Sequence, residues 1–168
     1  MSKILITGIV ASGKTTLAKQ LSSSLGIPWH ELDAIVHHRT SEGRHKRTAE
    51  EQLEVIRGID QSGPWIFEGV DRISYRHLFE MADTIIFLDP PLWKRKMRIM
   101  TRFIKQNLGL EKCGYRSDIV MLKLMYQWTR EFERNRSTFE SFLHPYQEKV
   151  IRLVDNDIRE IPELHLMK

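Results

Sequence analysis

Eight residues near the start of the chain have a spacing that suits phosphate binding. Residues 8–15 read Gly-Ile-Val-Ala-Ser-Gly-Lys-Thr, which fits the pattern G-x-x-x-x-G-K-T. Glycines in such a loop let backbone N–H groups point inward around a phosphate, and the helix that follows adds its positive end. Lys14 then binds the β- and γ-phosphates of a nucleoside triphosphate, and the Thr15 hydroxyl binds Mg²⁺. We expect phosphate contacts from Gly8, Ala11, Ser12, Gly13, Lys14, Thr15 and Thr16.

The segments on either side of this loop are those that the motif requires. Residues 3–7 form a short, branched, apolar run that is typical of a buried strand. Leu17, Leu21 and Leu25 follow at intervals of four residues, as in a helix that covers a sheet. The alternative is an ordinary glycine-rich turn, but the strand–loop–helix context favours nucleotide binding.

The composition indicates one domain with a substantial core. The chain has 168 residues, of which 41% are hydrophobic, and we treat residues 1–168 as a single domain.

No apolar run approaches the roughly 18 residues that span a bilayer, and a strand that begins at residue 3 leaves no room for a cleavable signal. Cys113 is the only cysteine. We therefore expect a cytoplasmic protein without a membrane partner. The net charge of +4 favours anionic partners, but nucleotides are themselves anions, so the charge alone does not indicate nucleic acid.

Strands and helices alternate along the rest of the chain. Further strands are expected at residues 27–32, 65–67, 84–88 and 149–154. Helices are expected from a capping box at residues 48–51 through residue 59, at 71–81, 92–106 and 117–143, and from residue 158 onward. Five short apolar strands separated by helices predict an α/β fold with three layers, in which helices cover both faces of a five-stranded parallel sheet.

Ligands of such sheets bind at the carboxyl ends of the strands, where an acid next to the phosphate loop commonly holds Mg²⁺. Two acids have a suitable position, Glu68 and Asp89. Asp89 follows the more apolar strand, but the two prolines after it favour a turn or a cap for the next helix. The residues alone leave both candidates open.

The segment Glu68-Gly69-Val70-Asp71-Arg72 resembles the acid–Gly–x–x–Arg segment of adenylate-kinase-like enzymes. That resemblance implies that Glu68 orders magnesium-bound water, that Arg72 holds the phosphate of the acceptor, and that the strand of Glu68 lies beside the first strand. It also implies ATP rather than GTP. Together with residues 27–33 and 82–90, this segment more narrowly resembles the topology modulation (FlaR-like) proteins, which are small kinases of the same superfamily. The basic, histidine-rich residues 37–47 depart from that narrower pattern.

Glu31 and Asp33 are two residues apart, so on a strand both side chains face the same side. In the small-molecule kinases that this chain resembles, acids at this place hold or deprotonate the acceptor hydroxyl. Asp33 could instead cap a short helix that begins at Ala34. Residues 34–63 would then form a helical segment on the acceptor side of the site.

Residues 92–105 contain six basic residues and no acid. Arg95, Arg98, Arg102 and Lys105 share roughly one quarter of the helix circumference, opposite a second set that consists of Trp93, Met97, Met100 and Ile104. Planar guanidinium groups suit the charge of a transferring phosphoryl group. In adenylate-kinase-like enzymes a lid entered from this helix supplies such arginines, which implies a helical lid within residues 95–143 and makes Arg98, Arg102 and Arg116 the candidates. The alternatives are a solvated basic surface and a nucleic-acid backbone site.

These patterns predict a kinase that moves the γ-phosphate of Mg-ATP to a small acceptor such as a nucleotide or nucleoside. Lys14, Asp33 and the lid arginines are the expected catalytic groups. A regulatory GTPase would need an N-K-x-D motif after a late strand, and residues 154–157 lack it. A DNA-associated ATPase is the alternative, based on the basic stretches 39–47 and 94–105. We expect a monomer or a homodimer.

Overall fold

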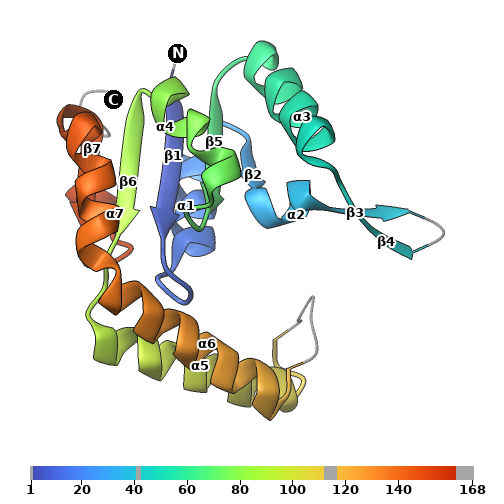
Figure 1. Cartoon of the computed structure of the whole chain (residues 1–168), viewed down its shortest axis with the longest axis vertical. Coiled ribbons are helices and arrows are strands. Elements are labelled where there is room, and N and C mark those ends of the chain that lie inside the picture. Colours follow the sequence, from blue (N-terminus) through green and yellow to red (C-terminus); the bar gives the residue numbers. More distant parts are fainter. Residues whose placement is uncertain (1, 41–42, 112–116, 162–168) are drawn as a thin grey trace.

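The computed structural model describes residues 2–40, 43–111 and 117–161 (Figure 1). Its centre is a sheet of five parallel strands, in the order β2-β5-β1-β6-β7. The strands are β1 (Lys3–Gly8), β2 (Trp29–Glu31), β5 (Trp65–Gly69), β6 (Thr84–Leu88) and β7 (Val150–Leu153). The five-stranded parallel sheet that the sequence predicts is therefore confirmed, and the strand of Glu68 lies beside β1 as the resemblance implies.

Successive residues of β1 pack into two separate cores, one on each face of the sheet. Ile4 and Ile6 lie in a cluster with Leu17 and Leu21 of α1 (Lys14–Leu25). Leu5, between them, lies in a cluster on the other face with side chains of α3 (Ala49–Ser62), α4 (His77–Met81) and α7 (Arg136–Leu143). This alternation is the two-residue period of a strand that is buried on both faces, and it gives the three layers.

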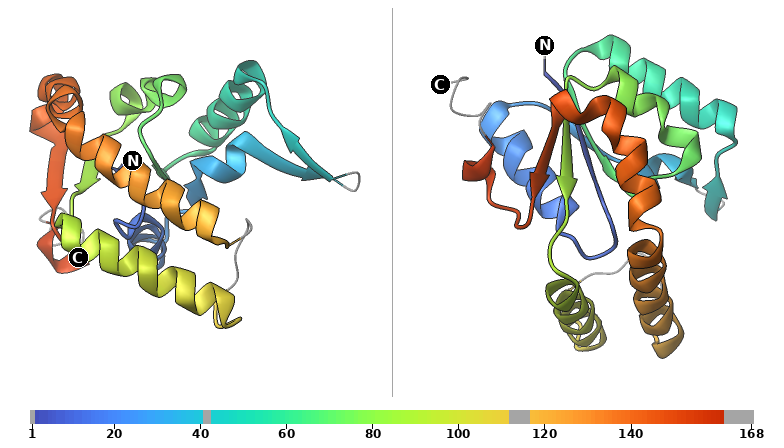
Figure 2. Two further views of the ribbon diagram at one scale, coloured as in Figure 1. Left: turned by 60° about the horizontal axis from the view of Figure 1, so that its bottom comes forward. Right: turned by 60° about the vertical axis from the view of Figure 1, so that its left-hand side comes forward.

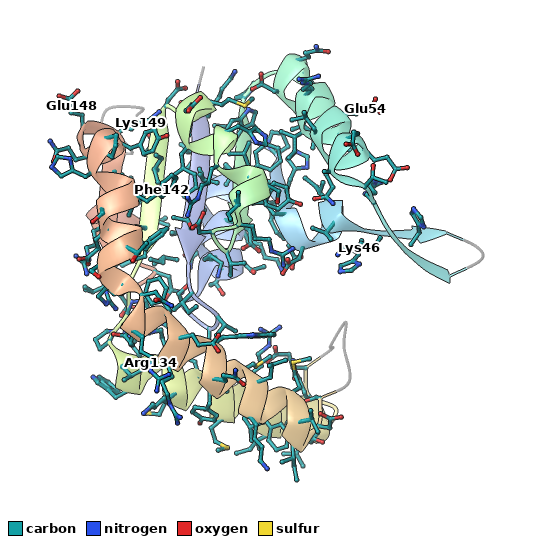
Figure 3. All side chains as sticks on the ribbon, in the orientation of Figure 1. Lys46, Glu54, Arg134, Phe142, Glu148 and Lys149 are labelled. Atoms are coloured by element: carbon teal, nitrogen blue, oxygen red, sulfur yellow. The ribbon has the colours of Figure 1, made fainter. Side chains whose placement is uncertain are left out.

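Aromatic side chains fill much of the second core. Phe142 of α7 packs edge-on against Phe79 of α4, with ring centroids 4.9 Å apart (Figure 3). Phe139 contacts Phe87 of β6 at 5.1 Å. Edge-to-face pairs of this kind add to the free energy gained from burial alone.

Some helix boundaries differ from the expected ones. The predicted capping box is present, because Glu51 N donates to Thr48 Oγ1 at 3.2 Å and Thr48 N donates to Glu51 Oε2 at 2.8 Å. The helix expected at 71–81 is instead a 3₁₀ turn, η1 (Ile73–Tyr75), followed by the short α4. The helix expected at 117–143 is divided at Asn135 into α6 (Ile119–Arg134) and α7, and a 3₁₀ helix, η2 (His144–Lys149), follows. At the end of the chain the described part contains only the 3₁₀ turn η3 (Ile158–Glu160).

The segment between β2 and α3 is not what the sequence indicates. β2 ends at Glu31, a helical turn α2 (Leu32–Val36) follows, and an antiparallel hairpin of β3 (His37–Thr40) and β4 (Gly43–Lys46) extends away from the sheet (Figure 1). Arg47 N donates to Val36 O at 2.9 Å, which closes the base of the hairpin. Residues 37–46 lack the alternation of apolar and polar residues that predicts a strand, so the sequence does not indicate this hairpin.

α5 (Leu92–Asn107) and α6 lie side by side beyond the carboxyl ends of the strands (Figures 1 and 2). They correspond to the first part of the lid segment expected at residues 95–143. None of the helices within the described residues is long and apolar enough to cross a membrane.

Candidate active site at the carboxyl edge of the sheet

The loop between β1 and α1 has glycines at two positions that do not favour a side chain. A Cβ atom on Gly8 would lie 2.5 Å from the carbonyl oxygen of Leu88, so a larger residue cannot approach β6 this closely. Gly13 has φ 105°, a left-handed conformation that favours glycine, and α1 begins at the next residue. Ser12 Oγ is buried and has no hydrogen-bond partner among the described residues. This geometry suits an anion at the amino end of α1.

Lys14 folds back over the loop. Its Nζ donates to Ile9 O at 2.9 Å, and the same carbonyl accepts a hydrogen bond from Ser12 N at 3.3 Å. Burial lowers the pKa of Lys14, while the carboxylate of Glu68 opposes that shift. A bound triphosphate would offer this partly desolvated ammonium a strong anionic partner.

Thr15 and Glu68 meet at the place where a magnesium ion is expected. Thr15 Oγ1 donates to Glu68 Oε1 at 2.6 Å, and Glu68 is only 3% exposed at the end of β5. Burial raises the pKa of Glu68, although the Lys14 charge and the Thr15 hydrogen bond oppose the rise. Among the described residues no group of three or more His, Cys, Asp and Glu side chains could hold a metal unaided. A hydroxyl and one carboxylate nevertheless fit Mg²⁺, which takes its other ligands from phosphates and water.

Asp89 does not have the role of a helix cap. The residue before α5 is Pro91, and no side chain caps this helix. Both carboxylate oxygens of Asp89 instead accept hydrogen bonds from Arg136, at 2.7 and 2.9 Å, and Oδ2 also pairs with Arg152. Burial alone would raise the pKa of Asp89, but the two arginines outweigh it and the pKa is lowered. Asp89 therefore connects β6 to α7 and β7, and both of its carboxylate oxygens already accept hydrogen bonds from arginines.

The acceptor-side residues come together, but not as the strand pattern suggests. Glu31 ends β2 and lies opposite Glu68 in the sheet register, whereas Asp33 lies in the first turn of α2. Glu31 and Asp33 therefore do not lie on the same face of one strand. The helix α2 begins at Leu32 rather than at Ala34. Asp33 Oδ1 accepts a hydrogen bond from Arg72 Nη2 at 2.6 Å. The charges of Glu31 and Asp33 raise the pKa of Lys14, although by less than burial lowers it, which places both acids near the loop.

Arg98 lies directly on the phosphate loop. Its Nη1 donates to Ser12 O at 2.5 Å, and Nη2 contacts Asn156 Oδ1 at 2.9 Å and Asp155 Oδ1 at 3.3 Å. Asp155 and Asn156 follow β7, where the rule for carboxyl ends of strands already places ligand contacts. Their pairing with Arg98 could not be read from the sequence.

The other basic residues of α5 have different environments. Arg102 Nε lies 3.2 Å from Glu111 Oε1, and its charge contributes to lowering the pKa of Lys14, behind the dominant effect of burial. Arg95 is fully buried, pairs with Glu133 and donates from Nε to Pro90 O at 3.0 Å, so it anchors the helix. Arg116 lies outside the described residues.

A cavity of about 230 Å³ adjoins the loop on the side of α6 and α7. Ile9, whose carbonyl holds Lys14, forms part of its wall. Asp71 and Arg76 contribute a charged pair, with Oδ2 and Nη2 3.2 Å apart, and Phe132 and Phe139 contribute apolar surface. Apart from Asp71, which belongs to the acid–Gly–x–x–Arg segment, these residues are not recognisable in the sequence as parts of a site, because a cavity leaves no periodic signal.

No family model matches the chain, and no curated protein matches it. Several solved structures share its architecture over nearly the whole length. A gluconokinase from Sinorhizobium meliloti is 17% identical, with a TM-score of 0.53 over 98% of this chain and 89% of that one. A shikimate kinase from Bacteroides thetaiotaomicron is 14% identical (TM-score 0.55; 99% and 93% covered). A shikimate kinase from Acinetobacter baumannii, solved with shikimate, is 12% identical (TM-score 0.59; 99% and 90% covered).

The chain has the fold of the P-loop kinases. The predicted fold class is thereby confirmed, whereas the narrower resemblance to the topology modulation proteins stays a prediction.

Proposed function

We propose that the chain is an ATP-dependent kinase that transfers the γ-phosphate of Mg-ATP to a hydroxyl group of a small acceptor. The observation that carries this proposal is the contact between Thr15 Oγ1 and Glu68 Oε1, next to Lys14 on the phosphate loop. The Thr15 hydroxyl and the Glu68 carboxylate are oxygen ligands of the kind that Mg²⁺ prefers, and the Lys14 ammonium suits the phosphates of a nucleoside triphosphate.

Each group has a distinct role in this proposal. The amides of residues 8–16 and the Lys14 ammonium hold the phosphates, and Thr15 and Glu68 would hold Mg²⁺. When bound there, Mg²⁺ would neutralise charge on the phosphate oxygens. Arg98 and Arg102 stabilise the transferring phosphoryl group from the side of α5.

The acceptor site lies between Asp33, Arg72 and the cavity beside Ile9. Asp33 accepts the proton of the acceptor hydroxyl, and Arg72 positions Asp33 and the acceptor. Sites for drug-sized ligands measure about 300–1,000 Å³, so a cavity of about 230 Å³ favours a smaller, sugar-sized molecule over a nucleotide. Gluconokinase and shikimate kinase as structural neighbours support an acceptor of this size class.

The described side chains favour the kinase over the DNA-associated ATPase. Arg95 is buried, and Lys94 and Arg98 pair with Asp155, so the first turns of α5 do not present a continuous basic face.

The decisive experiment is ADP release from Mg-ATP with a panel of acceptors, which includes sugars, hydroxy acids, nucleosides and nucleotides. We expect a small hydroxylated compound to accelerate release in the parent protein and not in Asp33→Asn. Acceptor-independent hydrolysis across the whole panel, with the same rate in both proteins, would contradict the proposal.

A further inference from the structure

Three side chains that line the cavity beside Ile9 carry buried polar atoms without a hydrogen-bond partner. Among the described residues these unpaired atoms are Thr7 Oγ1, Asp71 Oδ1 and Arg76 Nε. Thr7 is only 2% exposed, near the carboxyl end of β1. A buried polar atom without a hydrogen bond costs free energy, so three of them around one cavity indicate a ligand that supplies their partners.

The sheet fixes the position of Thr7 relative to the cavity. Alternate residues of a strand share a face, so Thr7 shares the face of Leu5, which packs in the core beneath α4 and α7. Arg76 immediately precedes α4 and Phe139 belongs to α7, and both residues line the same cavity. The Thr7 side chain therefore lies on the cavity side of the sheet.

Asp71 and Arg76 are held in place by contacts that do not use their unpaired atoms. Arg76 Nη2 donates to Asp71 Oδ2 at 3.2 Å, and the Arg76 guanidinium lies over the ring of Phe142, 4.2 Å from its centroid. Asp71 Oδ1 and Arg76 Nε take no part in this ion pair. The pair thus keeps one unused acceptor and one unused donor, and it carries no net charge.

The three unpaired atoms differ in what they bind. Asp71 Oδ1 only accepts hydrogen bonds, Arg76 Nε only donates them, and Thr7 Oγ1 does both. A ligand carboxylate would satisfy Arg76 but would lie against the carboxylate of Asp71, and a ligand ammonium group would meet the opposite conflict. A hydroxyl both donates and accepts, so neighbouring hydroxyls satisfy all three atoms without adding charge.

We propose that this cavity is the acceptor subsite for a neutral polyol, such as a sugar or a sugar alcohol, whose hydroxyls bind Thr7, Asp71 and Arg76. This inference rests on the proposed kinase activity and names the class of its acceptor. A sugar acid or a nucleotide, which brings its own negative charge, is a poorer ligand because Asp71 already neutralises Arg76.

The rest of the cavity wall suits a polyol next to a bound triphosphate. Phe132 and Phe139, whose ring centroids are 5.8 Å apart, provide apolar surface for the C–H groups of the ligand. Gly8 and Ile9, the first residues of the phosphate loop, form another part of the wall. A ligand in this cavity is therefore adjacent to the loop that we propose holds the phosphates.

Matched probes test the class of acceptor. Glycerol and glycerate, ribitol and ribonate, and glucitol and gluconate are pairs in which a neutral polyol differs from its acid at one terminal carbon. Binding in the presence of Mg-ADP is measured by calorimetry, and turnover is measured as ADP release from Mg-ATP. We expect at least one polyol to bind and to accelerate ADP release, with a kcat/KM at least about 10-fold above that of its acid.

Two variants test the residues that make this choice. Asp71→Asn keeps the shape but leaves Arg76 without its acid, so the ratio of kcat/KM for the polyol to that for the acid should fall at least about 10-fold. Thr7→Val removes a hydroxyl and should raise the KM for the polyol about 5-fold, with kcat and the affinity for Mg-ATP near the parent values.

Asp83→Asn is the matched control. Asp83 accepts a hydrogen bond from Lys3 N at 2.9 Å and directly precedes β6, at the opposite edge of the sheet from the cavity. Its loss should change neither the ratio nor the KM for the polyol.

The outcomes separate this inference from the proposed function. Phosphorylation of acids or nucleotides and not of polyols would overturn the inference and leave the kinase in place. Polyol kinetics that Asp71→Asn and Thr7→Val both leave unchanged would overturn it too, as would the absence of any binding to the polyols. Polyol binding that Thr7→Val weakens, without any ADP release, would support the subsite and contradict the kinase.

Discussion

The hydroxyl of Thr15 and the carboxylate of Glu68 form a 2.6 Å hydrogen bond that joins the first turn of α1 to the end of β5. The two residues are 53 positions apart in the chain, and the pairing of β5 with β1 brings them together. Because Glu68 is buried and Thr15 lies in the first turn of α1, this pair connects the sheet to the loop where we propose that phosphate binds.

Lys14→Ala should abolish tight binding of Mg-ATP without unfolding the domain. Its Nζ has one hydrogen bond to the loop, to Ile9 O, so removal costs little stability but removes a charged phosphate contact. We expect the affinity measured by calorimetry to fall at least about 100-fold. Lys19→Ala, on the exposed side of the same helix, is the control and should bind normally. Unchanged affinity in Lys14→Ala would remove the basis of the proposed function.

Glu68→Gln should lower magnesium-dependent turnover by about 100-fold or more, because it removes the negative charge and keeps the shape. The Thr15 hydroxyl can still donate to the amide oxygen, so the fold should persist. Glu54→Gln on the exposed face of α3 is the control (Figure 3). Turnover should be compared at several Mg²⁺ concentrations, and equal rates in the two variants would exclude Glu68 as a metal-organising group.

Asp89→Asn should destabilise the fold, by about 2 kcal/mol or more at neutral pH, whereas a cap or turn role would tolerate asparagine. The reason is that Arg136 and Arg152 would lose their shared charged partner. Since the folded-state pKa of Asp89 is lowered, its contribution is present above the unfolded value of 3.8 and is lost as the pH falls through the folded pKa.

The free energy of unfolding in urea, measured at pH 7 and below pH 3.8, tests this expectation. The difference between the parent protein and Asp89→Asn should shrink in acid. Glu140→Gln is the matched control, because Glu140 contacts the same two arginines at 3.8 and 3.3 Å but is 44% exposed. A loss as large in Glu140→Gln would mean that Asp89 has no special role in the network.

Arg102→Lys should lower turnover more than ATP affinity. If Arg102 stabilises the transferring phosphoryl group, an ammonium cannot reproduce the bidentate contact, and the loss appears in kcat. Arg130→Lys, exposed on α6, provides the comparison. Normal kcat in Arg102→Lys, together with DNA binding by the parent protein that weakens steeply with salt, would favour the nucleic-acid alternative.

Local patterns in the sequence were sufficient to predict the sheet, the strand–loop–helix arrangement of residues 3–25 and the capping box at Thr48. Each of them depends on neighbours within a few residues: glycine spacing, short branched apolar runs, or a side chain that caps the next turn. The order of strands β5 and β1 came from resemblance, and the structure agrees. These features are predictable because the chain can satisfy them locally.

Only the tertiary structure shows which charged residues lie at the candidate site. Arg95 and Arg98 are three residues apart on one basic face, yet Arg95 is buried against Glu133 and Arg98 lies on Ser12. Glu68 and Asp89 lie at the ends of β5 and β6, the two strands that flank β1, yet only Asp89 pairs with arginines from α7 and β7. Within α5, Met97 and Ile104 are exposed whereas Ile99 is buried. Ion pairs and burial between distant segments depend on how layers pack, and no periodicity in the sequence records that choice.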